Sequence, residues 1–221
     1  MRPQLSRIAA LVVLFLAAAC SDEGGRSTAD PGGDSGDSTP ATAGPDQSPC
    51  ELLGDDQVQA LAGTPLDETH ETTIVGEIPI CVWGSLNDIG VHAGVVAAST
   101  WARALPEAVE QAQASGLLDD ESNSTKLLEA ADLIRSGSTI PADEACVLFG
   151  ELVHLNGLPA GSDTTVNIVP TRDDPQAISG QACRDGRYAT VLLVRPDISG
   201  SRSELRRVEE ALETVISQRS R

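Results

Sequence analysis

The spacing of apolar positions changes several times along the chain, and each change marks an expected helix or strand. A short helix is expected from Asp55 to a stop at Gly63, with apolar side chains three and four residues apart. Three short strands follow, because three runs are rich in β-branched residues and bounded by polar turns. These strands are expected at 72–75, 80–83 and 91–97.

Two helices are expected next. Pro106 suits the first position of a helix that reaches Ser115. The second helix has an apolar face at spacings of three, four and seven, formed by Leu127, Ala130, Ala131 and Ile134. The acidic and polar stretch 119–125 between them is expected to be a loop.

A second block of elements begins at Pro141, another expected first helical residue. Its helix carries Cys146, Phe149 and Val153 on one stripe, and 164–169 alternates like a strand.

The last two elements have the strongest patterns in the chain. Residues 188–194 form an unbroken apolar run, which predicts a strand buried on both sides. Ser201 and Glu204 have the spacing of a capping box for a final helix. The apolar stripe of that helix consists of Leu205, Val208, Leu212, Val215 and Ile216.

The two blocks run in the same order: a cysteine, a helix, a threonine-rich strand, a second cysteine, a strong strand and an amphipathic helix. This order predicts an internal duplication, with halves at 49–137 and 138–221. The expected fold class is α+β, an antiparallel sheet covered by helices and built from two similar helix-strand-strand-helix halves. Whether the halves share one sheet or form two domains stays open.

The N-terminal residues are expected to form a signal peptide. Arg2 and Arg7 precede an apolar run at 8–19, which is about 18 Å long as a helix and too short for a bilayer core of about 30 Å. The small residues before Cys20 resemble a bacterial lipobox, which implies removal of 1–19 and a diacylglyceryl group on Cys20. The alternative is an ordinary secretory signal with a free thiol. Residues 20–48 are then expected to form a polar, disordered tether.

Charge excludes one class of function. The whole chain carries −18, and loss of the two leader arginines makes it more negative. Nucleic-acid binding needs clustered Lys and Arg, so no nucleic-acid partner is expected. Aromatic stacking platforms are limited to Trp83 and Trp101, and Trp83 is interpreted as a core residue beside a disulfide.

Four cysteines remain after Cys20, and an even set in an exported chain predicts two disulfides. Their spacing lacks the close pairs of a zinc site. Three pairings are possible. The repeat favours Cys50–Cys81 and Cys146–Cys183, each contributing about 3.5–4 kcal/mol by loop closure, whereas cross-pairing would join the two blocks.

The segments Pro49-Cys50-Glu51-Leu52-Leu53 and Cys81-Val82-Trp83, behind a lipobox and tether, resemble a family of actinobacterial envelope lipoproteins of unknown function. The resemblance implies a disulfide-bonded α+β domain held on the outer face of the cytoplasmic membrane. It carries over no catalytic residue. The second half has Cys183-Arg184-Asp185 in place of Cys-x-Trp.

Catalytic motifs are scarce. The sequence contains neither Gly-x-Ser-x-Gly nor Ser-x-x-Lys. The cluster of Asp67, Glu68, His70 and Glu71 is interpreted as a solvated loop, and no metal or cofactor is expected. His92 and His154 are interpreted as packing or surface residues.

We therefore expect a non-catalytic protein, anchored to the membrane by lipid, that binds an unknown envelope protein or small ligand. The alternative is a hydrolase whose site is assembled from dispersed residues. A pocket that gathers a histidine with two carboxylates would favour the enzyme, and an apolar groove or flat patch would favour binding. A structural envelope component with no small ligand would have neither.

Overall fold

The computed structural model describes residues 48–74, 78–85, 87–114 and 121–218. The predicted leader 1–19, the predicted lipidation site Cys20 and the predicted tether up to residue 47 lie outside the described residues.

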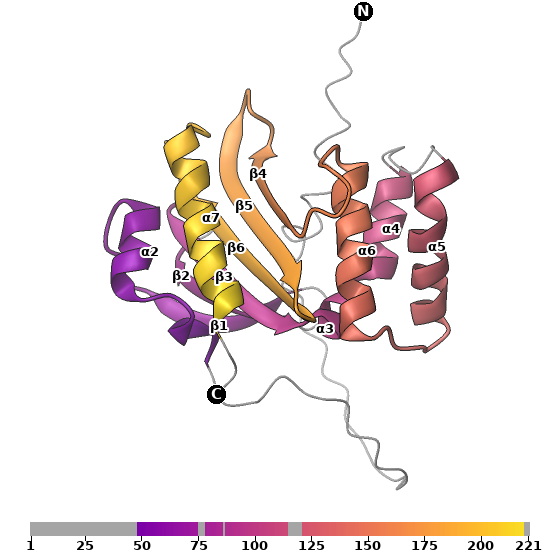
Figure 1. Ribbon diagram of the computed structural model, residues 1–221. Helices are drawn as coiled ribbons and strands as arrows, with labels where there is room; N and C mark the ends of the chain where they lie inside the picture. Colours follow the sequence, from indigo (N-terminus) through magenta and orange to yellow (C-terminus); the bar gives the residue numbers. More distant parts are fainter. Residues whose placement is uncertain (1–47, 75–77, 86, 115–120, 219–221) are drawn as a thin grey trace, which may run out of the picture.

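Six strands form one antiparallel sheet in the order β1-β2-β3-β6-β5-β4 (Figure 1). The strands are β1 (Thr69–Ile74), β2 (Ile78–Gly84), β3 (Gly90–Ala97), β4 (Thr164–Pro170), β5 (Pro175–Arg184) and β6 (Arg187–Val194). The helices are η3 (Pro49–Glu51), α2 (Asp55–Ala62), α3 (Ala98–Ala102), α4 (Leu105–Ala114), α5 (Glu121–Arg135), α6 (Ala142–Leu155) and α7 (Arg202–Ser217). The expected α+β class with an antiparallel sheet is confirmed.

The two halves share this sheet and meet where β3 pairs with β6. Each half contributes three consecutive antiparallel strands, and the edge strands are β1 and β4. A single hydrogen-bonded sheet crosses the predicted boundary between 137 and 138, so the halves do not form separate domains.

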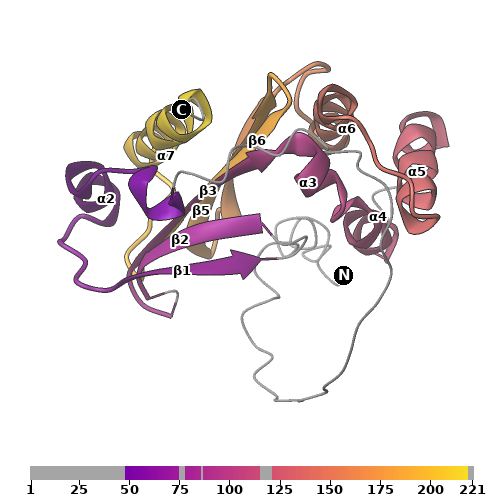
Figure 2. The ribbon, with the colours of Figure 1, turned by 90° about the horizontal axis from the view of Figure 1, so that it is seen from below.

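The helices lie on both sides of the sheet (Figure 2). On one side, α2 and α7 pack against side chains from β3, β5 and β6. On the other side, α3 and α6 cover one end of the sheet, with α4 and α5 packed farther out. Gly180 of β5 lets α7 approach closely, because a Cβ there would lie 3.0 Å from Val208 Cγ1.

The predicted disulfide pairing is confirmed. Cys50–Cys81 joins η3 to β2 and closes a separation of 31 residues, with a Cα–Cα distance of 4.8 Å. Cys146–Cys183 joins α6 to β5 and closes a separation of 37 residues, with a Cα–Cα distance of 5.1 Å. Each bond therefore ties the middle strand of one half to the helical segment that precedes its strands.

The halves are alike in strand order and differ in the side that their helices cover. Cys81 and α2 belong to the side of α7, whereas Cys183 and α6 belong to the opposite side. A two-fold axis that exchanges β3 and β6 is perpendicular to the sheet and keeps each side in place. That rotation therefore superposes the strands of the two halves but not their helices.

Several local predictions need correction. Residues Glu121–Thr125 begin α5 and are not part of a loop. Pro141 is the N-cap of α6, one position before the expected first helical residue. The sequence patterns did not identify α3 or β5, whose residues are poor in the periodicity that indicates a helix or a strand. Asp119 and Asp120 lie outside the described residues.

Candidate functional site

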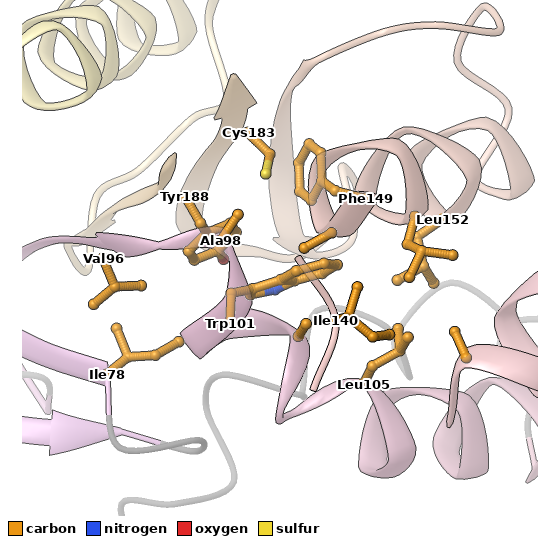
Figure 3. Close-up of a cluster of buried hydrophobic side chains, with 14 of the residues drawn as sticks. Ile78, Val96, Ala98, Trp101, Leu105, Ile140, Phe149, Leu152, Cys183 and Tyr188 are labelled. Atoms are coloured by element: carbon orange, nitrogen blue, oxygen red, sulfur yellow. The ribbon is translucent and has the colours of Figure 1, made fainter. Parts of the chain in front are cut away.

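Neither tryptophan offers an exposed stacking surface, because both side chains are buried. Trp101 of α3 stacks on Tyr188 of β6 with 5.4 Å between ring centroids, and its edge meets Phe149 of α6 at 5.6 Å (Figure 3). Trp83 is buried in the same cluster as Cys81, in agreement with its interpretation as a core residue. These rings therefore belong to the core, so a site on the sheet would have to be formed by other residues.

The side of the sheet opposite α7 carries three adjacent cross-strand rows whose strand residues include no acidic residue, lysine or arginine. Just before β1 begins, Glu68 lies beside the end of the third row, where its carbonyl oxygen accepts a hydrogen bond from the Gly84 amide. Directly paired residues of an antiparallel sheet point to the same side, so each row is a line of neighbouring side chains. We call these rows together the uncharged face. The first row is His70, Val82, His92, Leu192, Ser179 and Asn167. The second is Thr72, Ile80, Gly94, Thr190, Gln181 and Thr165, and the third is Gly84, Gly90, Val194, Ala177 and Val169.

Buried polar side chains gather on this face. Five polar or charged residues are buried in the described chain, and four of them belong to the first two rows. They are His92, Thr165, Ser179 and Thr190. Asn167 donates its amide proton to Thr165 Oγ1 at 2.8 Å. Buried polar groups are costly unless they are hydrogen-bonded, so their concentration on one face needs a reason.

His92 is the polar side chain of this face that has a ring nitrogen without a hydrogen-bond partner in the described part of the chain. It is only 8% exposed, and its Nε2 has no hydrogen-bond partner among the described residues. Burial, and to a smaller extent repulsion from His70 in the same row, together lower the pKa of His92 to about 4. The imidazole is therefore neutral near pH 7. A buried nitrogen without a partner costs about 1–3 kcal/mol, which a ligand can recover by pairing with it.

A small apolar cluster adjoins these polar groups. Val169, Ala177 and Leu192 are buried together, with Val194 packed against them. All four come from strands, so no described helix residue belongs to this cluster. By contrast, the cluster at the other end of the same side includes residues of α3, α4, α5 and α6. The uncharged face thus combines a buried apolar cluster made of strand residues alone with an unpaired imidazole nitrogen.

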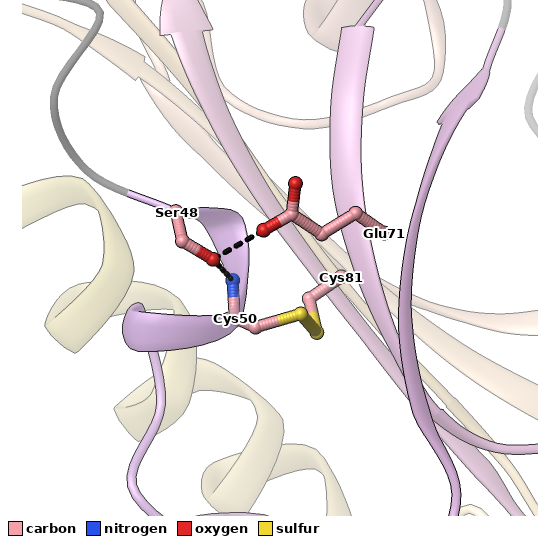
Figure 4. The surroundings of a disulfide bond; sticks show 4 residues. All are labelled: Ser48, Cys50, Glu71 and Cys81. Carbon is pink, nitrogen blue, oxygen red and sulfur yellow. Dashed lines mark hydrogen bonds between the residues drawn. A yellow bond between two sulfur atoms is a disulfide. The ribbon is translucent and has the colours of Figure 1, made fainter.

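The interpretation of Asp67, Glu68, His70 and Glu71 as a solvated loop is wrong for its second half, because His70 and Glu71 belong to β1. His70 points to the uncharged face, whereas Glu71, one residue later, points to the opposite side of β1. Ser48 donates a hydrogen bond to Glu71 and accepts one from the Cys50 amide at 3.1 Å, beside the Cys50–Cys81 bond (Figure 4). Among the described residues, no three His, Cys, Asp or Glu side chains come close enough to hold a metal ion.

The third histidine lies elsewhere. His154 is near the end of α6, and its Nδ1 lies 2.8 Å from the Leu158 carbonyl oxygen. The pocket that would favour an enzyme needs a histidine together with two carboxylates, and the rows around His92 contain no carboxylate. Sequence reasoning treated His92 as a packing residue. Only its partners across the sheet show that it is grouped with Ser179 and Thr190.

Within the described part of the chain, no helix combines the length and apolar character needed to cross a bilayer. Comparisons with protein-family models, curated proteins and solved structures found no match to this chain.

Proposed function

We propose that this chain is a lipid-anchored protein of the bacterial cell envelope that binds a ligand or partner through the uncharged face. Its diacylated Cys20 would hold the domain outside the cytoplasmic membrane, at the end of the tether 21–48. The two disulfides support export, since such bonds persist in oxidising compartments. The lipobox-like residues before Cys20 support the anchor.

The observation that carries the binding role is the composition of the uncharged face. A chain of net charge −18 has no Asp, Glu, Lys or Arg among the strand residues of three adjacent rows of its sheet, and places an unpaired imidazole nitrogen among them. Apolar side chains with a few polar groups are typical of ligand sites. A hydrolase site of the expected kind would require carboxylate partners for His92, and no strand residue of these rows is a carboxylate, so we favour binding over catalysis.

The anchor is tested by expressing the full chain in a bacterium and measuring the intact mass of the mature protein before and after reduction. We expect cleavage before Cys20, a diacylglyceryl increment and a gain of four hydrogens on reduction. The control variant Cys20→Ser should lose the lipid increment and keep both disulfides. A cytosolic product that retains its leader would contradict the proposal, as would a fully reduced one.

The binding face is tested separately with the exported chain from Ser21 onward, which keeps every described residue. Hydrogen exchange of its backbone amides is compared with and without an extract of bacterial envelope small molecules. Protection confined to β3, β5 and β6 would support binding at the uncharged face. Protection confined to α4 and α5, or turnover of extract components, would point to a different site or to an enzyme.

A further inference from the structure

We infer that two copies of this chain associate through β1, whose exposed edge pairs antiparallel with the same strand of a second copy and joins two six-stranded sheets into one. The inference goes beyond the proposed binding function and depends neither on the lipid anchor nor on the uncharged face. It comes from the two edges of the sheet, which differ in how well they are protected against pairing with a further strand.

The outer edge of β1 presents backbone groups that point away from the sheet. Gly84 donates its amide proton to the Glu68 carbonyl oxygen at 2.8 Å, which marks a hydrogen-bonded pair of the β1–β2 ladder. Such pairs alternate along an antiparallel ladder, so the even-numbered residues of β1 point their N–H and C=O groups to β2. The odd-numbered residues, Thr69, Glu71 and Thr73, point theirs outward. The first five residues of β1 are exposed, and no described helix lies beyond this rim of the sheet (Figure 2).

The other edge of the sheet is protected. Cys183 donates its amide proton to the Asp163 carbonyl oxygen at 2.8 Å, so the same alternation places position 170 on the outer edge of β4. That position is a proline, which has no N–H to donate, and the register shifts between Val169 and Pro170. By contrast, β1 contains no proline, lysine or register shift. Only β1 is therefore suited to accept a further strand.

The residues of β1 suit pairing with a second copy of the same strand. Two copies that pair antiparallel are related by a two-fold axis, so one patch serves on both. Three of the six residues are threonine, which favours strands and pairs well across them. A register centred on Thr72 places this residue opposite its own copy. It also places Glu71 opposite Thr73 and His70 opposite Ile74 of the second copy, so no two ionisable side chains of β1 lie directly opposite each other.

The backbone and the charges agree on this register. Glu71 of one copy and Thr73 of the other both point their N–H and C=O groups outward, so they form a hydrogen-bonded pair, and the symmetry repeats it. A register centred on Glu71 would place two carboxylates opposite each other, which is unfavourable. One centred on His70 would do the same with two imidazoles. The Glu71 carboxylate already accepts a hydrogen bond from Ser48 of its own chain, so it needs no partner across the interface (Figure 4).

The first test measures the oligomeric state of the exported chain from Ser21 onward by sedimentation equilibrium at several concentrations. We expect monomer and dimer in equilibrium, with more dimer at higher salt, because salt screens the repulsion between two acidic chains. Thr73→Pro removes an outward N–H and leaves the ladder to β2 in place, so it should weaken dimerisation at least tenfold without changing the circular dichroism of the monomer. The matched control Thr73→Val keeps the N–H and should dimerise like the wild type.

A second test uses cysteine cross-linking to determine the register. Thr72 and its copy form a non-hydrogen-bonded pair across the interface, with Cα atoms about 4.5 Å apart, which a disulfide can span. Thr72→Cys should therefore give a covalent dimer when the folded protein is treated with a copper–phenanthroline oxidant. Thr73→Cys is the control. It lies opposite Glu71 of the second copy and about 7–8 Å from its own counterpart, so it should stay monomeric in mass without reductant.

Other results would overturn the inference. A chain that stays monomeric at every concentration would remove the second copy as the partner and leave β1 open to a strand of a different protein. A dimer that is unaffected by Thr73→Pro would use another surface. Cross-linking of Thr73→Cys in place of Thr72→Cys would contradict the register, and growth beyond the dimer would show that β4 is not protected. The intact mass and the hydrogen exchange of the uncharged face test the proposed function independently of these results.

Discussion

His92 of β3 and Leu192 of β6 lie directly opposite each other across the central strand pair, where the two halves of the sheet meet. A buried imidazole at this joint makes the stability of the whole sheet sensitive to protonation. The paired strands come from distant parts of the chain, so a charge at this position would destabilise the contact between both halves.

Acid should therefore destabilise the protein through His92. The folded pKa is about 4, below the ordinary value of 6.5, so the unfolded chain takes up a proton first as pH falls. The contribution of neutral His92 to the free energy of unfolding is fully present above pH 6.5. It is lost as pH falls towards 4, and the loss is on the order of 3 kcal/mol. His70 is the only other ionisable group in the rows of the uncharged face.

Urea unfolding at several pH values measures this slope. The His92→Leu variant lacks the titrating group and should show a flatter dependence between pH 6.5 and 4. An equally steep slope in the variant would assign the pH dependence to other groups.

Glu204 is expected to be the most important carboxylate for stability. Burial raises its pKa, but hydrogen bonds from Ser199 and Ser201 outweigh burial and lower the pKa to about 2. Arg195 also pairs with it at 3.0 Å. Glu204→Gln should cost about 2–4 kcal/mol, since it leaves several buried donors poorly satisfied.

The control for this change is Glu209→Gln on the exposed face of α7, which should alter stability by less than about 0.5 kcal/mol. In the wild-type protein, the stabilisation that the ionised Glu204 carboxylate provides is fully present above pH 4.5 and is lost as pH falls towards 2. Equal stability of the two variants in urea would refute the role of Glu204.

Removal of either disulfide should lower stability by a similar amount. Separations of 31 and 37 residues correspond to about 3.5–4 kcal/mol each by loop-closure entropy. The paired substitutions Cys50→Ala with Cys81→Ala, and Cys146→Ala with Cys183→Ala, can be compared by urea unfolding. Trp83 and Trp101 lie in different clusters and report on the two sides of the sheet separately. A loss below about 1 kcal/mol for both pairs would contradict the entropic estimate.

Two glycines should respond to alanine in opposite directions. At Gly94 a Cβ would lie 2.8 Å from the Pro79 carbonyl oxygen, so Gly94→Ala should cost about 1–3 kcal/mol through overpacking. At Gly150, inside α6, the nearest atom would be 3.4 Å away, so Gly150→Ala should stabilise by up to about 1 kcal/mol. Thermal unfolding of both variants measures the two effects, and a change of the same sign in both would contradict the difference in packing between the two sites.

Local patterns predicted much of the secondary structure. Val58, Leu61 and Ala62 form the buried face of α2, and Gly63 ends that helix with a positive φ of 78°. Ser201 and Glu204 form the predicted capping box of α7. These features depend on residues three or four positions apart, so a helix of known period places them without knowledge of the rest of the fold.

Elements whose conformation depends on neighbours were missed. Pro175–Arg184 contains Gly, Ser and Gln and lacks a strong strand pattern, yet it is the middle strand of its half and pairs on both edges. Pairing on both edges satisfies its backbone hydrogen bonds and overrides its weak propensity. The same dependence explains the candidate site, because nothing in the sequence indicates that His92 shares a cross-strand row with Ser179.

The sequence by itself determined the helices with clear apolar faces, the strongest strands, and a cysteine set whose favoured pairing the fold confirms. The tertiary structure decided that both halves share one sheet, which side each helix covers, and which side chains form the uncharged face. The physical reason is the distance along the chain over which each kind of interaction acts. Periodicity and capping act within a few residues, whereas a row across six strands exists only after register and helix packing have fixed every pairing.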